Sequence, residues 1–140
     1  MPTSKHLTLL AWIVAASSTL GSLFFSEVMK LPPCVLCWYQ RIAIYPLVLI
    51  LGVAWLKDDT RVKLYALPLV VAGLLVAIYH NLLYYKILPE SISPCVQGIS
   101  CTTRQIEWLG FITIPLLSLA SFALLTLIFT LPSRPRSLPS

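Results

Sequence analysis

Long apolar runs separated by short polar segments dominate the chain. Four of these runs carry almost no charge, and each is about as long as a helix must be to cross a hydrocarbon core roughly 30 Å thick. A backbone in lipid has to satisfy its own polar groups, so helices are expected. The pattern predicts an all-α integral membrane protein, a four-transmembrane-helix bundle in a single domain. Its expected helices cover residues 7–26, 37–56, 64–85 and 108–131.

The segments between these helices leave little chain outside the bilayer. Residues 27–36 and 86–107 form the expected loops on one side of the membrane, and the Pro-rich residues 132–140 are expected to be a disordered tail. The first apolar run is long for a signal peptide, and no clear small-residue cleavage site precedes Glu27. We therefore expect this run to be retained as a helix.

Composition agrees with a membrane protein. Hydrophobic residues make up 58% of the chain and charged residues only 11%, whereas a soluble domain carries about a quarter charged residues. The net charge of +5 reflects where lysine and arginine lie in the loops, and it gives no support to nucleic-acid binding.

The distribution of basic residues predicts the orientation. Lysine and arginine are enriched in cytoplasmic loops. Six of them fall on one predicted face: Lys5, Lys57, Arg61, Lys63, Arg134 and Arg136. The other face holds Lys30, Arg41, Lys86 and Arg104. Both termini are therefore expected to be cytoplasmic, with the two long loops outside.

All four cysteines then lie on the extracytoplasmic side, where disulfides persist. Cys34 and Cys37 follow the first helix, and Cys95 and Cys101 lie in the 86–107 loop. Zinc is disfavoured, because only the first pair has CxxC spacing and no histidine is predicted on this loop face. A c-type haem would need histidine where Trp38 stands. Purely structural disulfides remain an alternative, although a disulfide that closes such a short loop stabilises a chain only modestly.

Redox exchange is the sharper hypothesis for these cysteines. Cys37 is expected at or next to the start of the second helix, where the positive end of the dipole favours a thiolate. Arg41 follows four residues later on the same helix face, and an intramembrane arginine is costly unless it has an interior role. His80 is expected at a similar depth on the third helix. With Arg41 it could bracket a polar headgroup, although snorkelling of Arg41 and a simple helix–helix hydrogen bond from His80 are the plainer alternatives.

These motifs carry a family resemblance. "PPCVLCWYQRI", the histidine of "IYHNLLYY" and the cysteines of "PCVQGISC" before "WLGFITIPLLSL" resemble DsbB-type disulfide bond formation proteins, most closely the compact BdbC-type members. The resemblance covers residues 7–131. It implies a quinone-dependent protein-disulfide oxidoreductase in the bacterial cell membrane, with ubiquinone or menaquinone as electron acceptor and no metal.

The resemblance also implies a role for each residue. A thioredoxin-like extracytoplasmic oxidase of the DsbA or BdbD type would pass its electrons to a Cys95–Cys101 disulfide. Cys34 and Cys37 would reoxidise that pair through a mixed disulfide, and Cys37 would hand the electrons to the quinone. Arg41 would stabilise the thiolate and the quinone, and His80 would lie near the quinone ring.

Two features limit the resemblance, and two rival hypotheses remain. Gln40 stands where many members have an acidic residue, which puts a proton-transfer role there in doubt. The short loop of the second cysteine pair leaves less room for an interfacial helix. A vitamin K epoxide reductase-like enzyme is one rival, but its CxxC should come after the loop pair. A non-enzymatic membrane subunit stapled by disulfides is the other.

Overall fold

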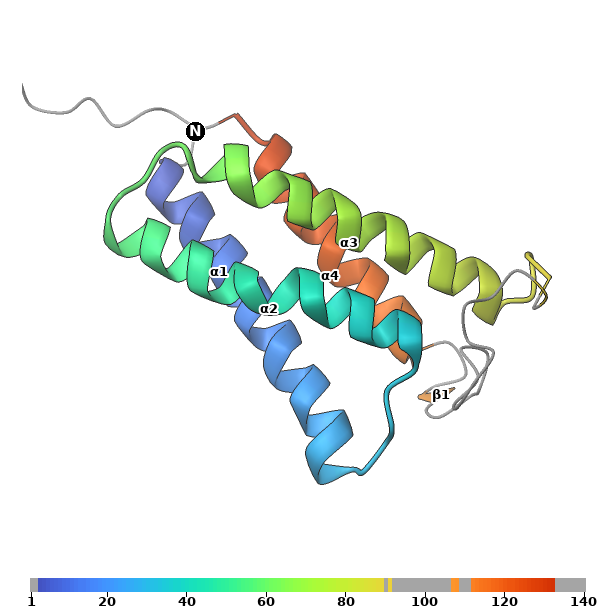
Figure 1. Ribbon diagram of the computed structural model, residues 1–140. Helices are drawn as coiled ribbons and strands as arrows, with labels where there is room; N and C mark the ends of the chain where they lie inside the picture. Colours follow the sequence, from blue (N-terminus) through green and yellow to red (C-terminus); the bar gives the residue numbers. More distant parts are fainter. Residues whose placement is uncertain (1–2, 90, 92–106, 109–111, 133–140) are drawn as a thin grey trace, which may run out of the picture.

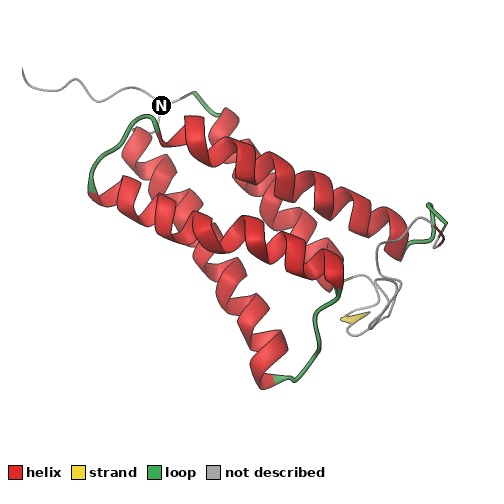
Figure 2. Ribbon diagram, in the orientation of Figure 1, coloured by secondary structure: helices red, strands yellow, loops and turns green. Residues whose placement is uncertain are grey.

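The computed structural model describes residues 3–89, 91, 107–108 and 112–132. Four helices make up nearly all of this described chain (Figures 1 and 2). They are α1 (Ser4–Leu23), which continues into the π-helix η1 (Phe24–Val28), α2 (Val35–Leu56), α3 (Val62–Tyr84) and α4 (Ile114–Thr130). The predicted helical architecture is confirmed for these residues. A two-residue antiparallel pair is added to it, β1 (Glu107–Trp108) with β2 (Ile112–Thr113).

The four helices form a ring of contacts in which each helix packs against two others. α1 contacts α2 and α4, and α3 contacts α2 and α4. Figure 1 shows the C-terminal half of α1 diverging from the other three helices, with the chain returning from its end to the start of α2. This divergence leaves space between α1, α2 and α4 at the end of the bundle where α2 begins.

The core and the outer surface are both apolar. Leu47, Leu51 and Leu125 are fully enclosed between the helices, whereas Leu49 and Leu64 are 73% and 82% exposed. In water such an outer surface would be unfavourable, but in a bilayer it faces lipid. Within the described residues, three helices are long and apolar enough to cross a membrane, namely Ser4–Val28, Val35–Leu56 and Val62–Tyr84, and α4 is a shorter apolar helix.

The fourth helix begins later than the sequence pattern suggests. Trp108 lies in β1, and α4 begins at Ile114. Thr113 caps this helix, because its hydroxyl accepts a hydrogen bond from the Leu116 N–H at 3.3 Å, and Pro115 occupies the first turn, where proline costs no hydrogen bond. An apolar run alone does not reveal such a start, because Trp108 and the residues after it are as hydrophobic as the helix itself.

A glycine and an aromatic ring allow α3 and α4 to pack closely. Phe122 of α4 is 2% exposed, and its ring lies directly over Gly73 of α3. Asn81 adds a polar link between the same helices, since its side-chain amide donates to the carbonyl oxygens of Ala77 and Pro115, both at 2.8 Å. Together these contacts hold the end of α3 that carries His80.

Candidate functional site

The first cysteine pair lies at the start of α2. The prolines Pro32 and Pro33 precede it, and Cys34 is the N-cap with extended backbone (φ −77°, ψ 174°). The Cys34 sulfur accepts a hydrogen bond from the Cys37 N–H at 3.4 Å. The two Sγ atoms are 2.9 Å apart, and both cysteines are free thiols. A CxxC sequence in the first turn of a helix brings its two sulfurs together in this way, so a disulfide here requires only small side-chain movements.

The helix N-terminus therefore acts on Cys34 directly. The sequence pattern placed the thiolate-stabilising position at Cys37, but the residue that caps α2 is Cys34. The pKa of the Cys34 thiol is lowered well below its ordinary value, chiefly by a hydrogen bond from the Cys37 side chain. Burial opposes this effect, whereas hydrogen bonds from His80 and from the Cys37 N–H reinforce it. Of the two sulfurs, Cys34 carries the surroundings of a stabilised thiolate.

His80 reaches the cysteine pair from α3. Its side chain is 2% exposed, and its Nε2 atom lies 3.8 Å from the Cys34 sulfur. The other ring nitrogen, Nδ1, lies 3.4 Å from the amide nitrogen of Gln40, which is itself 6% exposed. The imidazole is thus held between a buried amide on α2 and the sulfur at the start of the same helix.

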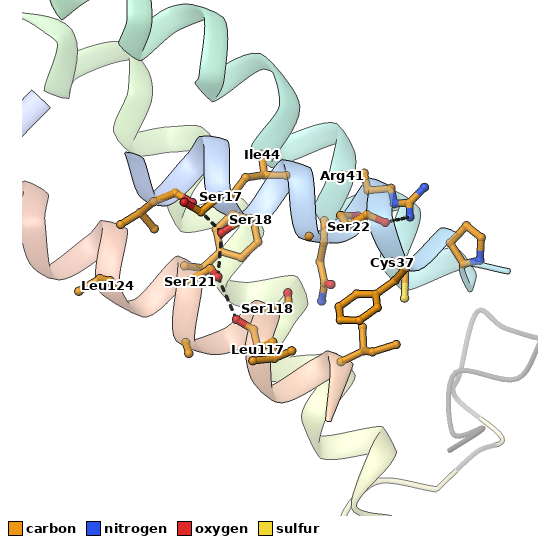
Figure 3. Close-up of a pocket in the computed structure, with 18 of the residues that line it drawn as sticks. Ser17, Ser18, Ser22, Cys37, Arg41, Ile44, Leu117, Ser118, Ser121 and Leu124 are labelled. Carbon is orange, nitrogen blue, oxygen red and sulfur yellow. Dashed lines mark hydrogen bonds between the residues drawn. The ribbon is translucent and has the colours of Figure 1, made fainter. Parts of the chain in front are cut away.

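Arg41 faces a different direction from His80. Its guanidinium Nη2 donates to the carbonyl oxygen of Ser22, near the end of α1, at 3.0 Å, and the group lies 5.3 Å from the centroid of the Trp38 ring. Cation–π contacts of this kind contribute about 0.5–1 kcal/mol at exposed sites. Arg41 thereby ties α2 to α1, and its charge also lies on the wall of a cavity (Figure 3).

This cavity occupies about 590 Å³ between α1, α2 and α4. Figure 3 shows Cys37 and Arg41 at one end of it, with serines of α1 and α4 farther along. Ser18 and Ser121 join the two helices through a 2.9 Å hydrogen bond between their hydroxyls. The rest of the lining is mostly aliphatic and aromatic: Ile13, Val14, Phe25, Leu31, Ile44, Ile114, Leu117, Phe122 and Leu124. Such a cavity suits a largely apolar molecule with a few polar atoms.

The structure brings four of the six predicted site residues to one end of the bundle. Cys34, Cys37 and His80 form one cluster, and Arg41 lies beside Cys37 on the cavity wall. The described residues that line the cavity do not include His80. Cys95 and Cys101 lie outside the described residues.

Sequence reasoning did not assign a partner to Gln40 or recognise the serines of α1 and α4. Gln40 drew notice only because it occupies a position where an acidic residue was expected, and its contact with His80 depends on how α2 packs on α3. The serines of α1 and α4 did carry a signal, because hydroxyl side chains recur within otherwise apolar spans, where they often mark helix contacts.

The cluster also resembles part of a metal site. The sulfurs of Cys34 and Cys37 and a ring nitrogen of His80 lie within 4.8 Å of one another. A structural zinc ion takes four protein ligands, and within the described chain this group offers three. Short sulfur–sulfur spacing is equally what a redox-active pair requires, so the cluster alone does not assign a metal.

Comparison with known proteins places the chain among disulfide formation proteins. The family model "Disulfide bond formation protein DsbB" matches residues 4–131. Disulfide bond formation protein C of Bacillus subtilis (strain 168) is 50% identical over 121 residues, which cover 86% of this chain and 88% of that protein. Probable disulfide formation protein C 2 of Bacillus cereus is 44% identical over 129 residues, 92% of each chain. A probable disulfide formation protein of Metapseudomonas resinovorans is 42% identical over 130 residues, 92% of this chain and 90% of that protein. No solved structure matches significantly.

Proposed function

The chain belongs to the DsbB family of disulfide bond formation proteins, and we propose that it reoxidises an extracytoplasmic thioredoxin-like protein and passes the electrons to a membrane quinone. Its family and its apolar helices make it a multi-pass membrane protein with a role in disulfide formation. The family match favours this proposal over the two rivals, a vitamin K epoxide reductase-like enzyme and a stapled membrane subunit.

For the topology, we propose four spans with both termini in the cytoplasm. Lys5 near the N-terminus pairs with Asp58 of the α2–α3 loop at 3.2 Å, which supports a shared face for these two segments. Cys34 at the start of α2 contacts His80 near the end of α3. These helix ends lie away from the α2–α3 loop, on the side assigned to the extracytoplasmic space. As a fourth span, the 17-residue α4 would rely on local thinning of the bilayer and on flanking residues.

The first exchange involves the loop pair. A thiolate of the reduced partner attacks a Cys95–Cys101 disulfide; resolution of the mixed disulfide leaves the partner oxidised and the loop pair as two thiols. A loop thiolate then attacks the Cys34–Cys37 disulfide at Cys34, and Cys37 leaves with the bonding electron pair. Closure of the loop disulfide releases Cys34. Each step exchanges one disulfide for another, and two electrons reach the Cys34–Cys37 pair.

The second exchange takes place at the cavity. The one observation that carries this proposal is the position of Cys37, whose sulfur is 2.9 Å from that of Cys34 and also lines the cavity. A disulfide closing between these sulfurs would release its two electrons at the cavity wall. Bound there, a quinone supplies a lipid-soluble two-electron acceptor.

The residues of the cavity fit a quinone headgroup. Arg41 supplies N–H donors for carbonyl oxygens at the end near Cys37. Farther along, the buried hydroxyl of Ser118 has no hydrogen-bond partner within the described chain, and aliphatic side chains complete the walls. Ubiquinone and menaquinone both meet these requirements. We expect Arg41 to hold the headgroup, and contact of His80 with the quinone stays a prediction.

Steady-state turnover tests the proposed function. The purified protein in detergent is supplied anaerobically with a reduced thioredoxin-like oxidase and a short-chain quinone, and loss of quinone absorbance is followed. We expect quinone reduction that requires both the partner and the quinone, and that disappears in Cys37→Ser. A Ser118→Ala variant tests the cavity, with a raised KM for quinone and an unchanged rate of the first partner exchange. Partner oxidation without quinone consumption would contradict the assignment of the acceptor.

A further inference from the structure

The buried amide of Gln40 is a polar group that the proposed reaction does not require for electron transfer. It lies on α2, between the cysteine pair and the core, and is 6% exposed. Burying an amide without a hydrogen bond is unfavourable, and the contact that Gln40 makes is to Nδ1 of His80, at 3.4 Å from its amide nitrogen. The identity of the two atoms decides what this contact does.

An amide nitrogen has two hydrogens to donate and no lone pair to accept with. A hydrogen bond donated by this nitrogen makes Nδ1 of His80 the acceptor, and an accepting Nδ1 carries no proton. A neutral imidazole has one N–H, which then resides on Nε2. That nitrogen lies 3.8 Å from the Cys34 sulfur, within hydrogen-bonding reach for a sulfur acceptor.

We propose that Gln40 is a positioning residue for Cys34: it donates to Nδ1 of His80 and thereby keeps the imidazole proton on Nε2, where it hydrogen-bonds the Cys34 sulfur. This inference deepens the proposed function and rests on it for its role in turnover. Hydrogen bonds to an ionised acceptor are roughly twice as strong as neutral ones. The contact therefore strengthens when Cys34 becomes a thiolate.

Cys34 becomes a thiolate at a defined step. When a mixed disulfide on Cys34 is resolved, an incoming thiolate forms a bond to the partner sulfur, and the bond between that sulfur and Cys34 breaks. The electron pair of the broken bond stays on Cys34. The Nε2–H of His80 stabilises this departing sulfur without giving up its proton, and Gln40 and His80 supply no electrons.

Substitution of Gln40 leaves the other described ionisable groups near Cys34 unchanged. Cys37 on α2 and Tyr79 on α3 pack against the cluster that contains Cys34, and Arg41 acts electrostatically on Cys37. The residues of α4 include no ionisable side chain. On α1, Lys5 pairs with Asp58 and His6 lies in the first turn. Glu27 lies in η1. Substitution of Gln40 leaves all of these groups in place.

The protonation of the ring nitrogens can be observed directly. The chain has two histidines, so His6→Gln leaves His80 as the single imidazole for nitrogen-15 NMR of the reduced full-length protein in detergent at about pH 8. We expect an unprotonated Nδ1 and a protonated Nε2. Gln40→Glu should place a proton on Nδ1, because a carboxylate only accepts. A protonated Nδ1 in the protein with Gln40 would overturn the proposal.

The effect on Cys34 is measured in a background with one thiol. Cys37→Ser, Cys95→Ser and Cys101→Ser together leave Cys34 alone, and the pH dependence of its alkylation rate reports formation of the thiolate. We expect the midpoint to rise by about half to one pH unit in Gln40→Met and by about one to two units in His80→Leu. An unshifted midpoint in Gln40→Met, with a shifted one in His80→Leu, would refute a role for Gln40.

Asn81→Leu is the matched control, because it removes another buried amide, next to His80 on α3, without touching the cysteines. It should lower thermal stability and leave both the ring protonation and the Cys34 midpoint unchanged. An equal shift in Asn81→Leu would mean that general loosening, and not the Gln40 contact, moves the midpoint, which would also refute the proposal. Neither measurement involves quinone or the partner protein, so failure of this inference is distinguishable from failure of the proposed relay.

Discussion

Replacing Gly73 with alanine tests the close contact between α3 and α4. A Cβ atom at this position would lie 2.1, 2.4 and 2.7 Å from three carbons of the Phe122 ring, so the ring or the helices must shift by more than an ångström. Overpacking a filled core typically costs about 1–3 kcal/mol, and so tight a contact belongs in the upper half of that range. Alanine recovers about 0.5–1 kcal/mol of helix propensity. We expect a net destabilisation of about 1–2.5 kcal/mol.

The assay is reversible unfolding in mixed micelles with increasing denaturing detergent, followed by tryptophan fluorescence. Gly21→Ala is the matched control, because a Cβ there meets nothing within 4 Å, and it should be neutral or slightly stabilising. Phe122→Leu, combined with Gly73→Ala, should recover part of the loss by making room. Wild-type stability in Gly73→Ala, or an equal loss in Gly21→Ala, would show that the helices do not approach as closely as described.

Three further substitutions each test one contact of the structure. Arg41→Lys keeps the charge but loses the planar fork, so the KM for quinone should rise about ten- to a hundred-fold while a single exchange with the partner stays near normal; unchanged kinetics with lower stability would make Arg41 an anchor only. Asn81→Leu removes the bond to the Pro115 carbonyl and should cost about 0.5–1.5 kcal/mol in the same unfolding assay. The Tyr65 hydroxyl donates to the Asp59 carboxylate and lowers its pKa, so Tyr65→Phe should raise that pKa in a carboxyl NMR titration. Because the folded pKa is depressed, the associated stabilisation is present above the ordinary value and is lost as the pH falls through the folded one.

The helical architecture follows from the sequence because hydrophobic runs have few alternatives in lipid. The start of α4 does not, because it depends on the cap supplied by Thr113 and on the β1–β2 pair, and an apolar run carries no information on either. The divergence of α1 also escapes a pattern analysis. It is defined by contacts with other helices, and the side chains along α1 are too uniformly apolar to show which face is buried.

Part of the candidate site could likewise be predicted from the sequence, and part could not. Cys34, Cys37 and Arg41 are adjacent in the chain, so local helix geometry was enough to group them. The approach of His80 to Cys34, and of Gln40 to His80, requires α2 and α3 to pack in one particular register. Sequence reasoning therefore expected His80 at a depth similar to that of Arg41, but it did not assign Cys34 or Gln40 as its neighbours. The cavity depends on three helices at once, and no single segment could have revealed it.

The transfer of electrons from the first cysteine pair to a quinone is the central claim, and a single-turnover measurement tests it most directly. A Cys95→Ser, Cys101→Ser protein, with Cys34 and Cys37 reduced, is mixed anaerobically with a short-chain quinone, and quinol and thiols are counted. We predict one quinol for each Cys34–Cys37 disulfide formed, and none after Cys37→Ser. Full loss of thiols without quinol, or equal quinol in the Cys37→Ser protein, would contradict the account.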